Sequence, residues 1–314
     1  MLVMVAPGQG AQIPGFLKSW LEEPAFADHI HWLSTVCGID LEHYGSEADA
    51  DSIRDTAIAQ PLIVGTGLLG ARALFSRSAG RPALIDVAAG HSLGELTVAA
   101  SVGMLSEEQT MVLVRERGRA MAATAAKSEA GMVAVLGGDP DDVQATIERL
   151  GLVTVNDNGP GQVVAAGARE AIARLVAEPP AATRIRPLQI AGAFHTPEVE
   201  HVAVRLGRCA RAITPLTPPA RLLSNRDGEV VTDGREMLDR IVRQVSLPVR
   251  WGLCMETMTR LGVTGLLELP PASTLTRIAR RALPGVEAFA LNTPDQLDDA
   301  RVFVDKHTTA PGPA

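Results

Sequence analysis

The chain has 314 residues, of which 46% are hydrophobic, and its 36 acidic and 29 basic side chains give a net charge of -7. That length suffices for one large or two ordinary globular domains, and the acid excess argues against nucleic-acid binding, because phosphate neutralisation requires a basic surface. The three cysteines are far apart, and the two longest uncharged runs, 1–17 and 56–71, are short and broken by proline and glycine. We therefore expect a soluble, reduced, cytoplasmic protein with no disulfide framework and no membrane span.

The first half of the chain alternates between strand-like and helix-like patterns, which is typical of an α/β fold. Leu2 to Ala6 is a short apolar run that predicts a buried strand, and a glycine-rich loop follows it at 7–12. A second strand is predicted at 84–88, where a loop at 90–95 leads into a short helix. A longer helix is predicted over 107–126.

The pattern changes between residues 132 and 190. Shorter segments there predict the order strand, helix, strand, strand, helix, strand, which is the β-α-β-β-α-β unit of a ferredoxin-like subdomain. We therefore predict an α/β fold in which residues 1–128 and 191–314 form an α/β-hydrolase-like catalytic domain, and residues 129–190 form an inserted ferredoxin-like subdomain. The six predicted segments are 132–136, 141–150, 152–156, 162–166, 169–177 and 184–190.

Ser92 is the candidate nucleophile. It lies in Gly90-His91-Ser92-Leu93-Gly94, a G-x-S-x-G sequence between a predicted strand and a predicted helix. In a nucleophile elbow, small flanking residues allow a sharp turn that exposes the hydroxyl, and the helix N-terminus offers N–H groups to a developing oxyanion. A structural turn without a catalytic role is the alternative interpretation of the same residues.

A serine hydroxyl needs a neighbouring base to become a nucleophile, and His195 is the best candidate among the seven histidines. It follows a predicted strand, in a loop that can direct its side chain into a cleft, although a surface or core histidine is the alternative. His91 adjoins Ser92 but is expected to point away from it along the turn. The histidine spacings match no metal-binding pattern, so we predict no metal site.

Arg117 lies on the side of its predicted helix that should be buried, together with Leu113, Val114 and Met121. A buried guanidinium requires a carboxylate or several other acceptors, since an unpaired charge there is strongly destabilising. Two interpretations therefore stay open, namely an internal ion pair or a fork that binds the carboxylate of an anionic substrate.

Two glycine-rich segments raise the question of a nucleotide site. Gly65 to Gly70 spells G-x-G-x-x-G, but it lies within an apolar predicted helix and not in a strand-to-helix turn, so close helix packing explains it better. The loop from Gly8 to Gln12 lacks the third glycine of that fingerprint. It suits backbone N–H donation toward a bound oxygen, and an ordinary tight turn explains it equally well.

Five segments carry these residues in a particular order and spacing along the chain. They are Pro7-Gly8-Gln9-Gly10-Ala11-Gln12, Gly90-His91-Ser92-Leu93-Gly94-Glu95, Arg115-Glu116-Arg117-Gly118, Val155-Asn156-Asp157-Asn158-Gly159-Pro160-Gly161-Gln162-Val163-Val164 and Phe194-His195. Taken together, they resemble malonyl-CoA:acyl carrier protein transacylases, a family with fatty-acid and polyketide forms. The resemblance spans almost the whole chain, and its motifs are specific jointly although each alone is weak.

The resemblance implies a serine–histidine dyad. Ser92 would accept the acyl group, His195 would act as its base, and a backbone carbonyl near Arg250 would orient the imidazole. The N–H groups of Gln9 and Leu93 would form the oxyanion hole.

The resemblance also implies how the substrate is chosen. Arg117 would bind the free carboxylate of a malonyl group. Phe194 before the histidine and Leu93 after the serine are similar to malonyl users in the family and lean against a branched methylmalonyl unit. The pocket would further be lined by His91, Asn156 and Asn158.

The implied reaction moves malonyl from malonyl-CoA, which is a substrate and not a cofactor, to the phosphopantetheine thiol of an acyl carrier protein. A monomeric enzyme is implied, and the alternatives are an editing thioesterase on the same fold and a non-catalytic interaction protein. Because carriers of this pathway are acidic, docking would need a local basic patch, for which a solvated helix face is the alternative explanation. The two candidate patches are Arg205, Arg208 and Arg211, and Arg277, Arg280 and Arg281.

Two positions depart from the family's usual sequence. Leu247 stands where relatives often have Asn or Ser, and Pro270-Pro271-Ala272 replaces a typical Gly-Pro-Gly. Proline cannot adopt the positive-φ conformations of glycine, so we expect a reshaped loop at the pocket edge or at the carrier-docking surface.

Overall fold

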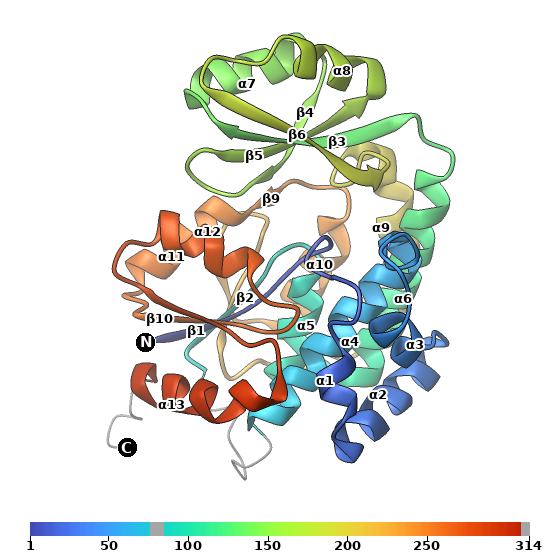
Figure 1. Ribbon diagram of the computed structural model, residues 1–314, viewed down its shortest axis with the longest axis vertical. Coiled ribbons are helices and arrows are strands. Elements are labelled where there is room, and N and C mark those ends of the chain that lie inside the picture. Colours follow the sequence, from blue (N-terminus) through green and yellow to red (C-terminus); the bar gives the residue numbers. More distant parts are fainter. Residues whose placement is uncertain (76–84, 309–314) are drawn as a thin grey trace.

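Two β-sheets, one above the other in Figure 1, organise the part of the chain that the computed structural model describes, residues 1–75 and 85–308. Helices flank both sheets, so the predicted α/β class is confirmed. Leu84, the first residue of the predicted second strand, lies outside the described residues.

The larger sheet has the first strand of the chain at its centre. β1 (Leu2–Ala6) pairs in parallel with β10 (Gly265–Glu268) on one side and with β2 (Val87–Gly90) on the other. The strand order is β11-β10-β1-β2-β7-β8, in which β7 and β8 are antiparallel and the other neighbours are parallel. Parallel strands are typically buried on both faces, and every residue of β1 is fully buried. The other strands are β7 (Arg221–Leu223), β8 (Val230–Val231) and β11 (Glu287–Ala290).

Helices cover both faces of this sheet. Successive side chains of β1 point in opposite directions, so β1 contacts the helices on both faces. Leu2 and Met4 pack against one group of helices, whereas Val3 and Val5 pack against α11 and α12 on the other face. The first group includes α2 (Pro24–Cys37), α4 (Thr56–Phe75), α5 (Gly94–Ser101), α6 (Glu107–Ala125) and α13 (Leu297–His307). The second comprises α11 (Trp251–Arg260) and α12 (Thr274–Ala282). Further helices are α1 (Lys18–Leu21), α3 (Leu41–Ser46), α9 (Glu200–Ala210) and α10 (Gly234–Gln244), with 3-10 turns at Ser52–Arg54, Pro197–Val199 and Pro294–Gln296.

Local sequence signals determine where important helices begin. The Ser106 hydroxyl accepts the N–H of Gln109, and the Gln109 side chain accepts the N–H of Ser106, which makes a reciprocal cap for α6. Asp139 caps α7 (Pro140–Arg149), which has a proline at its first position. The predicted helix over 107–126 is thus confirmed with its start at the expected residue.

Helix α4 corrects one expectation from the sequence. The run 56–71 is too short to span a membrane, but α4 extends to Phe75, and its 20 residues are long and apolar enough to do so. In the structure, 83% of its most apolar window is buried inside the protein. Packing against neighbouring elements therefore accounts for its apolar sequence.

The glycines of α4 permit this close packing. A Cβ atom at Gly67 would lie 2.6 Å from Cγ2 of Thr97 in α5, and one at Gly70 would lie 2.5 Å from ring carbons of Pro270. The packing role predicted for the G-x-G-x-x-G sequence is confirmed. Pro270, which lies in the loop that we expect to be reshaped, is itself one of the partners in this contact.

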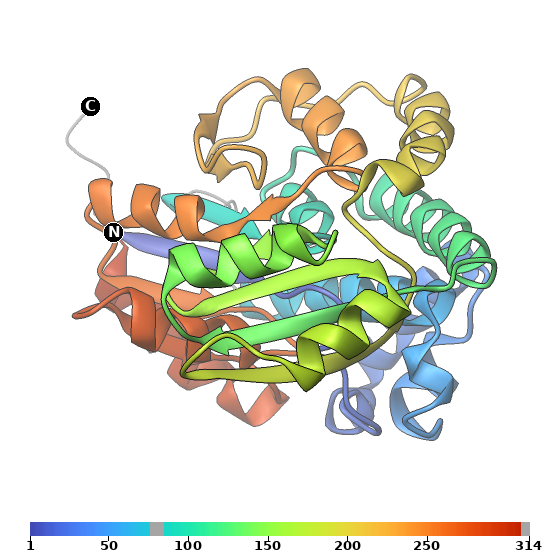
Figure 2. The same cartoon turned by 90° about the horizontal axis from the view of Figure 1, so that it is seen from above.

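The smaller sheet is formed by residues 130–191 and is extended by one strand from a later part of the chain. Its order is β6-β3-β5-β4-β9, in which neighbours among the first four are antiparallel. Helices α7 and α8 (Arg169–Ala177) cover its outer face (Figure 2). The predicted order of elements is confirmed, but β9 (Val249–Arg250), which pairs in parallel with β4, was not predicted. The other strands are β3 (Ala130–Gly137), β4 (Val153–Asp157), β5 (Gln162–Ala168) and β6 (Thr183–Ala191).

Candidate active site

Ser92 lies on a sharp turn between β2 and α5, with a φ of 54° that is unfavourable for a residue with a side chain. The turn requires glycines on either side. A Cβ atom at Gly90 would lie 1.9 Å from the carbonyl carbon of Gly94, and one at Gly94 would lie 2.2 Å from the carbonyl oxygen of Ala6. This strand, turn and helix form the context that a nucleophile elbow needs, as the sequence predicts.

His195 approaches Ser92 from the segment that follows β6. Its Nε2 lies 2.9 Å from Ser92 Oγ, and its Nδ1 lies 2.9 Å from the carbonyl oxygen of Gln244 and 3.2 Å from that of Leu247. Because carbonyl oxygens only accept, these contacts assign the ring proton to Nδ1 and leave Nε2 free to accept the serine proton. The structure therefore brings the predicted nucleophile and the predicted base into hydrogen-bond contact.

The carbonyl groups that orient His195 belong to Gln244 and Leu247 in the turn after α10, so the predicted carbonyl near Arg250 is that of Leu247, three residues earlier, and not that of Arg250 itself. Helix α10 ends at Gln244, and the chain reverses at once, with the N–H of Leu247 donating to the carbonyl oxygen of Gln244 at 3.1 Å. That reversal brings both carbonyls to the imidazole. Arg250 follows in β9, where its N–H donates to the carbonyl oxygen of Asn225 and its guanidinium to that of Arg226.

The protonation state of His195 suits a general base. Burial, together with the nearby positive charge of Arg117, lowers the pKa of His195 to about 3. The hydrogen bonds to Gln244 and Leu247 act in the opposite direction but do not offset the burial. The imidazole is therefore neutral at neutral pH.

Arg117 reaches the same point from α6, and only 2% of its surface is exposed. Its Nη2 lies 3.2 Å from Ser92 Oγ and 3.4 Å from Gln244 Oε1, whereas its Nη1 has no hydrogen-bond partner in the described part of the protein. Burial lowers the pKa of Arg117 to about 10, which leaves the guanidinium charged at neutral pH. Of the two interpretations, a direct internal ion pair is absent within the described ranges, and a charged fork with one free nitrogen is suited to a carboxylate.

Two backbone amides beside Ser92 are free to bind an oxyanion. Within residues 1–75 and 85–308, the N–H groups of Gln9 and Leu93 have no acceptor, whereas the N–H of Ser92 donates to Asn225 Oδ1 at 2.8 Å. Gln9 follows β1 and Leu93 follows β2. Because these parallel strands are neighbours, their carboxyl ends bring the two predicted oxyanion donors to the same edge of the sheet.

A cavity of about 550 Å³ opens between the glycine-rich loop after β1 and the smaller sheet. Ser92, His195 and Arg117 do not line this cavity, and they are 9%, 5% and 2% exposed, so the reactive groups are buried. The lining of this cavity includes the predicted residues Gln9, His91, Asn156 and Asn158.

The predicted pocket residues divide into two groups. His91 Nε2 lies 2.8 Å from Asn158 Oδ1, and Asn156 Oδ1 is buried without a partner among the described residues. Phe194, in contrast, is 4% exposed and packs in the hydrophobic core without lining the cavity. An effect of Phe194 on substrate choice would therefore act through packing beside His195.

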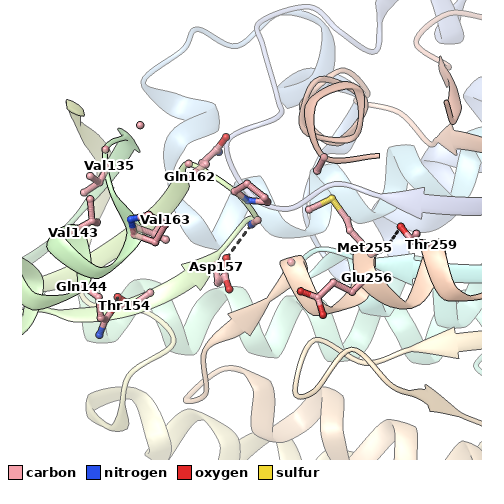
Figure 3. Close-up of a pocket in the computed structure, with 18 residues that line it drawn as sticks. Val135, Val143, Gln144, Thr154, Asp157, Gln162, Val163, Met255, Glu256 and Thr259 are labelled. Carbon is pink, nitrogen blue, oxygen red and sulfur yellow. Dashed lines mark hydrogen bonds between the residues drawn. The ribbon is translucent and has the colours of Figure 1, made fainter. Parts of the chain in front are cut away.

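A second cavity, of about 440 Å³, lies on the other side of segment 156–163 (Figure 3). Asn156 and Asn158 line the first cavity, Asp157 lines the second, and Gln162 lines both. Alternate residues of the segment therefore face opposite ways, as in an extended chain. Ser92, His195 and Arg117 line neither cavity, but Gln9 and His91, which lie beside the serine turn, line the first cavity and not the second.

Three buried residues around the turn were missed by the sequence analysis, namely Glu95, Asn225 and Gln244. Gln244 Nε2 donates to the carbonyl oxygen of Ser92 at 2.9 Å, and Asn225 Nδ2 donates to that of Gly90 at 2.8 Å. Glu95 is 1% exposed and accepts the N–H of Asn225 at 2.6 Å. The sequence did offer a signal for Glu95, because it is the one charged residue in a short helix that should be buried. Asn225 and Gln244 have no comparable feature in the sequence.

A serine on a strand-to-helix turn, beside a neutral histidine, two free N–H groups and a buried arginine, is an arrangement suited to acyl transfer. Residues 3–300 match the family described as "Acyl transferase domain". The class that the fold and the site define is therefore that of the acyltransferases.

The relatives give a more particular result. A malonyl CoA-acyl carrier protein transacylase of Mycobacterium bovis is 42% identical over 301 residues, which cover 95% of this chain and 99% of the relative. The crystal structure of MCAT from Mycobacterium tuberculosis matches with a TM-score of 0.91 and 41% identity, over 96% of this chain and 100% of that one. A type II PKS acyl-carrier protein in complex with its malonyl-transacylase matches with a TM-score of 0.87 and 28% identity, over 96% and 99%. The chain belongs to the malonyl CoA-acyl carrier protein transacylase family, which confirms the resemblance.

Proposed function

We propose that this protein transfers a malonyl group from malonyl-CoA to the phosphopantetheine thiol of an acyl carrier protein through an acyl-Ser92 intermediate. The contact of 2.9 Å between Ser92 Oγ and His195 Nε2, beside a buried and charged Arg117, carries the proposal. The names of the relatives support it, as does the carrier complex of a structural relative. Malonyl-CoA is a substrate in this scheme, and no separate cofactor takes part.

In the first half-reaction, His195 Nε2 takes the proton of Ser92 Oγ as that oxygen attacks the thioester carbonyl carbon. The free N–H groups of Gln9 and Leu93 stabilise the oxyanion of the tetrahedral intermediate. The bond to sulfur then breaks, and the protonated imidazole returns its proton to the leaving coenzyme A thiolate. Ser92 is left as the malonyl ester.

In the second half-reaction, the phosphopantetheine thiol of the carrier binds in the place that the coenzyme A thiol has left. His195 accepts the thiol proton, the sulfur attacks the ester carbonyl, and Ser92 leaves with the proton that His195 returns. The buried dyad favours this acceptor over water, because a bound thiol arm excludes solvent from groups that are already at least 90% covered.

An editing thioesterase on the same fold is the weaker alternative. It requires water at the acyl-serine, and neither the burial of the dyad nor the transacylase names of the relatives favour this. A non-catalytic interaction protein is disfavoured by the intact contact between nucleophile and base.

Incubation with malonyl-CoA is expected to add one malonyl group to Ser92, and a holo acyl carrier protein added afterwards is expected to gain that group. Intact-mass spectrometry of both proteins measures the transfer, with acetyl-CoA as a second donor. Ser92→Ala is the matched control and is expected to stay unmodified. Release of malonate without a mass gain on the carrier would identify a thioesterase, and the absence of any adduct would identify an interaction protein.

We infer that the carrier docks on α12 and not on α9. Residues of α12 line the cavity of about 550 Å³, and Arg277, Arg280 and Arg281 are exposed on the same helix. No residue of α9 belongs to that lining, and Arg205 of α9 is already paired with Glu116 at 2.6 Å. A basic surface beside this cavity suits an acidic carrier whose arm must reach Ser92.

Reversing two of these charges, with Arg280→Glu and Arg281→Glu together, is expected to raise KM for the carrier about tenfold, since each charge at an interface rim contributes roughly 0.5–1 kcal/mol. The rate of acylation by malonyl-CoA should not change. Arg208→Glu with Arg211→Glu on α9 is the matched control. Steady-state transfer to the carrier measures both pairs, and a larger effect of the α9 pair would place the docking surface there instead.

We further infer that residues 1–128 and 191–314 form an α/β-hydrolase-like domain around a ferredoxin-like subdomain at 129–190. The order β6-β3-β5-β4 with antiparallel neighbours supports the second part of this division. We also expect a cytoplasmic monomer that binds neither nucleic acid nor membrane. Sedimentation analysis tests the monomer.

A further inference from the structure

A chain of polar groups connects Arg117 with a buried carboxylate beneath the active site. Arg117 Nη2 donates to Gln244 Oε1 at 3.4 Å, and Gln244 Nε2 donates to Oε2 of Glu95. Gln244 is 4% exposed and Glu95 is 1% exposed. Opposite charges are therefore joined here through one amide group instead of a direct ion pair.

The same carboxylate begins a second chain, which ends at the nucleophile. Oε1 of Glu95 accepts the N–H of Asn225 at 2.6 Å, and Asn225 Oδ1 accepts the N–H of Ser92 at 2.8 Å. Gln244, held by the other oxygen, donates to the carbonyl oxygen of Ser92 and presents its own carbonyl oxygen to His195. Glu95 thus anchors the two residues that orient the reactive groups.

We propose that Glu95 is a positioning residue that, in its ionised form at alkaline pH, carries the counter-charge of Arg117 while the acyl site is empty, and that this form takes up a proton from solvent when a malonyl carboxylate binds Arg117. The inference rests on the proposed malonyl transfer and extends it to the charge balance of the site. The only bond that forms at Glu95 is O–H.

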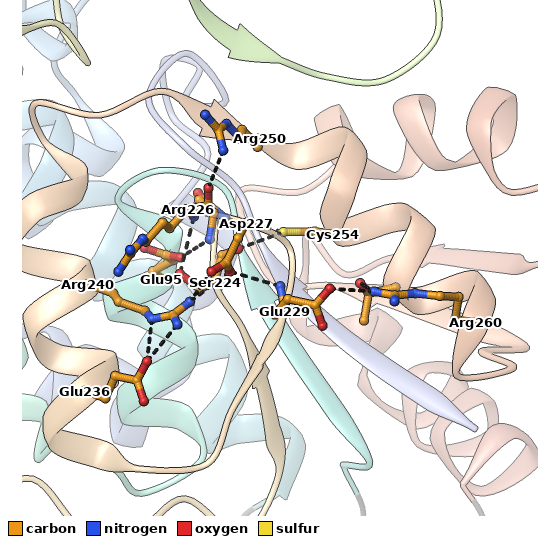
Figure 4. A network of polar contacts seen from close by, with 12 residues as sticks. Glu95, Ser224, Arg226, Asp227, Glu229, Glu236, Arg240, Arg250, Cys254 and Arg260 are labelled. Carbon is orange, nitrogen blue, oxygen red and sulfur yellow. Dashed lines mark hydrogen bonds and ion pairs between the residues drawn. The ribbon is translucent and has the colours of Figure 1, made fainter.

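Several ionisable groups lie in the polar network around Glu95 (Figure 4). Arg240 on α10 is neutralised by Asp227 at 2.8 Å. His195 is neutral because its pKa is lowered to about 3, and burial raises the pKa of the Cys254 thiol on α11 well above its usual range. Arg117 on α6 is therefore the unpaired positive charge that faces Glu95.

A second carboxylate changes this balance. Burial raises the pKa of Glu95 to about 8, although the hydrogen bonds from Asn225 and Gln244 and the charge of Arg117 oppose the rise. A malonyl carboxylate on Arg117 removes that opposing charge and adds a like one. The pKa of Glu95 then rises further, so protonated Glu95 favours malonyl binding and ionised Glu95 disfavours it.

The consequence is a preference for malonyl that weakens as pH rises. Binding of malonyl-CoA and of acetyl-CoA to the Ser92→Ala variant, measured by isothermal titration between pH 6 and pH 9, tests it. The ratio of the two affinities cancels the titration of the coenzyme A phosphates, which both ligands share. If malonyl raises the pKa of Glu95 from about 8 to about 9, the malonyl-to-acetyl ratio falls about fivefold between pH 6 and pH 9.

Glu95→Gln in the same background keeps the size of the side chain but cannot ionise. The malonyl-to-acetyl ratio should then be independent of pH, and titrations in buffers of different ionisation enthalpy should show no proton uptake. Glu256→Gln on the exposed face of α11 is the matched control and should keep the fivefold fall. In the active enzyme, Glu95→Gln should lower the acylation rate at saturating malonyl-CoA by about tenfold without raising KM. The amide has one accepting oxygen where the carboxyl group uses two, so either Asn225 or Gln244 loses its contact and the turn at Ser92 is held less firmly.

The possible results distinguish a failure of the proposed function from a failure of the proposed role of Glu95. A Ser92→Ala protein that shows no preference for malonyl-CoA at any pH would overturn the proposed function itself. A clear preference with a flat ratio between pH 6 and pH 9 in wild-type Glu95 would overturn only the counter-charge role. The wild-type titration decides this even if Glu95→Gln fails to fold.

Discussion

Arg117→Ala is expected to slow acylation by malonyl-CoA by about 100-fold and to leave acylation by acetyl-CoA within a few-fold of the wild-type rate. The guanidinium is buried, charged and has one free nitrogen, so a malonyl carboxylate can accept two charge-assisted hydrogen bonds from it. Loss of such a pair costs about 3 kcal/mol, which corresponds to that change in rate. Single-turnover acylation, quenched and followed by intact mass, measures both donors.

Arg119→Ala is the matched control, because Arg119 lies two residues further along α6 and is exposed to solvent. It should retain the wild-type selectivity. Arg117 Nη2 also contacts Ser92 Oγ at 3.2 Å, so a small loss with acetyl-CoA is compatible with a binding role. Equal and large losses with both donors would instead show that Arg117 acts through the structure of the elbow.

His195→Ala is expected to reduce acylation by both donors by about 1000-fold, within the range that general bases contribute. The Ser92 proton then has no acceptor at 2.9 Å, while the N–H groups of Gln9 and Leu93 remain in place and support the residual rate. His201→Ala is the matched control, since His201 is exposed and contacts Thr124. A loss of less than tenfold for His195→Ala would rule out His195 as the base.

The same histidine predicts the pH dependence of the wild-type enzyme. Because burial lowers the pKa of His195 to about 3, the neutral form persists as pH falls through 6.5, where a solvated histidine would become protonated. The single-turnover acylation rate should therefore stay near its plateau from pH 8 to pH 5.5. A decline centred at pH 6.5 would mean that the base is in contact with solvent in the enzyme.

Local signals in the sequence predicted the parts of the site that depend on backbone turns. Glycines at 90 and 94 around Ser92 marked the elbow, and apolar neighbours on one helix face predicted the burial of Arg117. The element order of the smaller sheet could likewise be predicted, because each of its strands and helices has its own hydrophobic periodicity and is bounded by turn residues. In each case, the residues that fix the structure lie within about one helical turn of one another.

The parts that the sequence did not predict depend on contacts between distant segments. The carbonyl of Gln244 reaches His195 across 49 positions, and Asn225 reaches Ser92 across 133 positions. The strand β9 has only two residues, which is too short for a hydrophobic pattern, and it is defined by its pairing with β4. An amide or a backbone carbonyl is common in any chain, so only the folded arrangement distinguishes these groups from their equivalents elsewhere.

The central place of β1 also determines the order in which the enzyme can be completed during synthesis. Leu2 pairs with Gly265, so β1 waits for its second neighbour until all the residues from β1 to β10 have been synthesised. Until then, one edge of a wholly apolar strand has no partner, which is the kind of surface that aggregates. We expect nascent chains that stop before β10 to depend on chaperones, and catalytic competence to appear only after β10 has been synthesised.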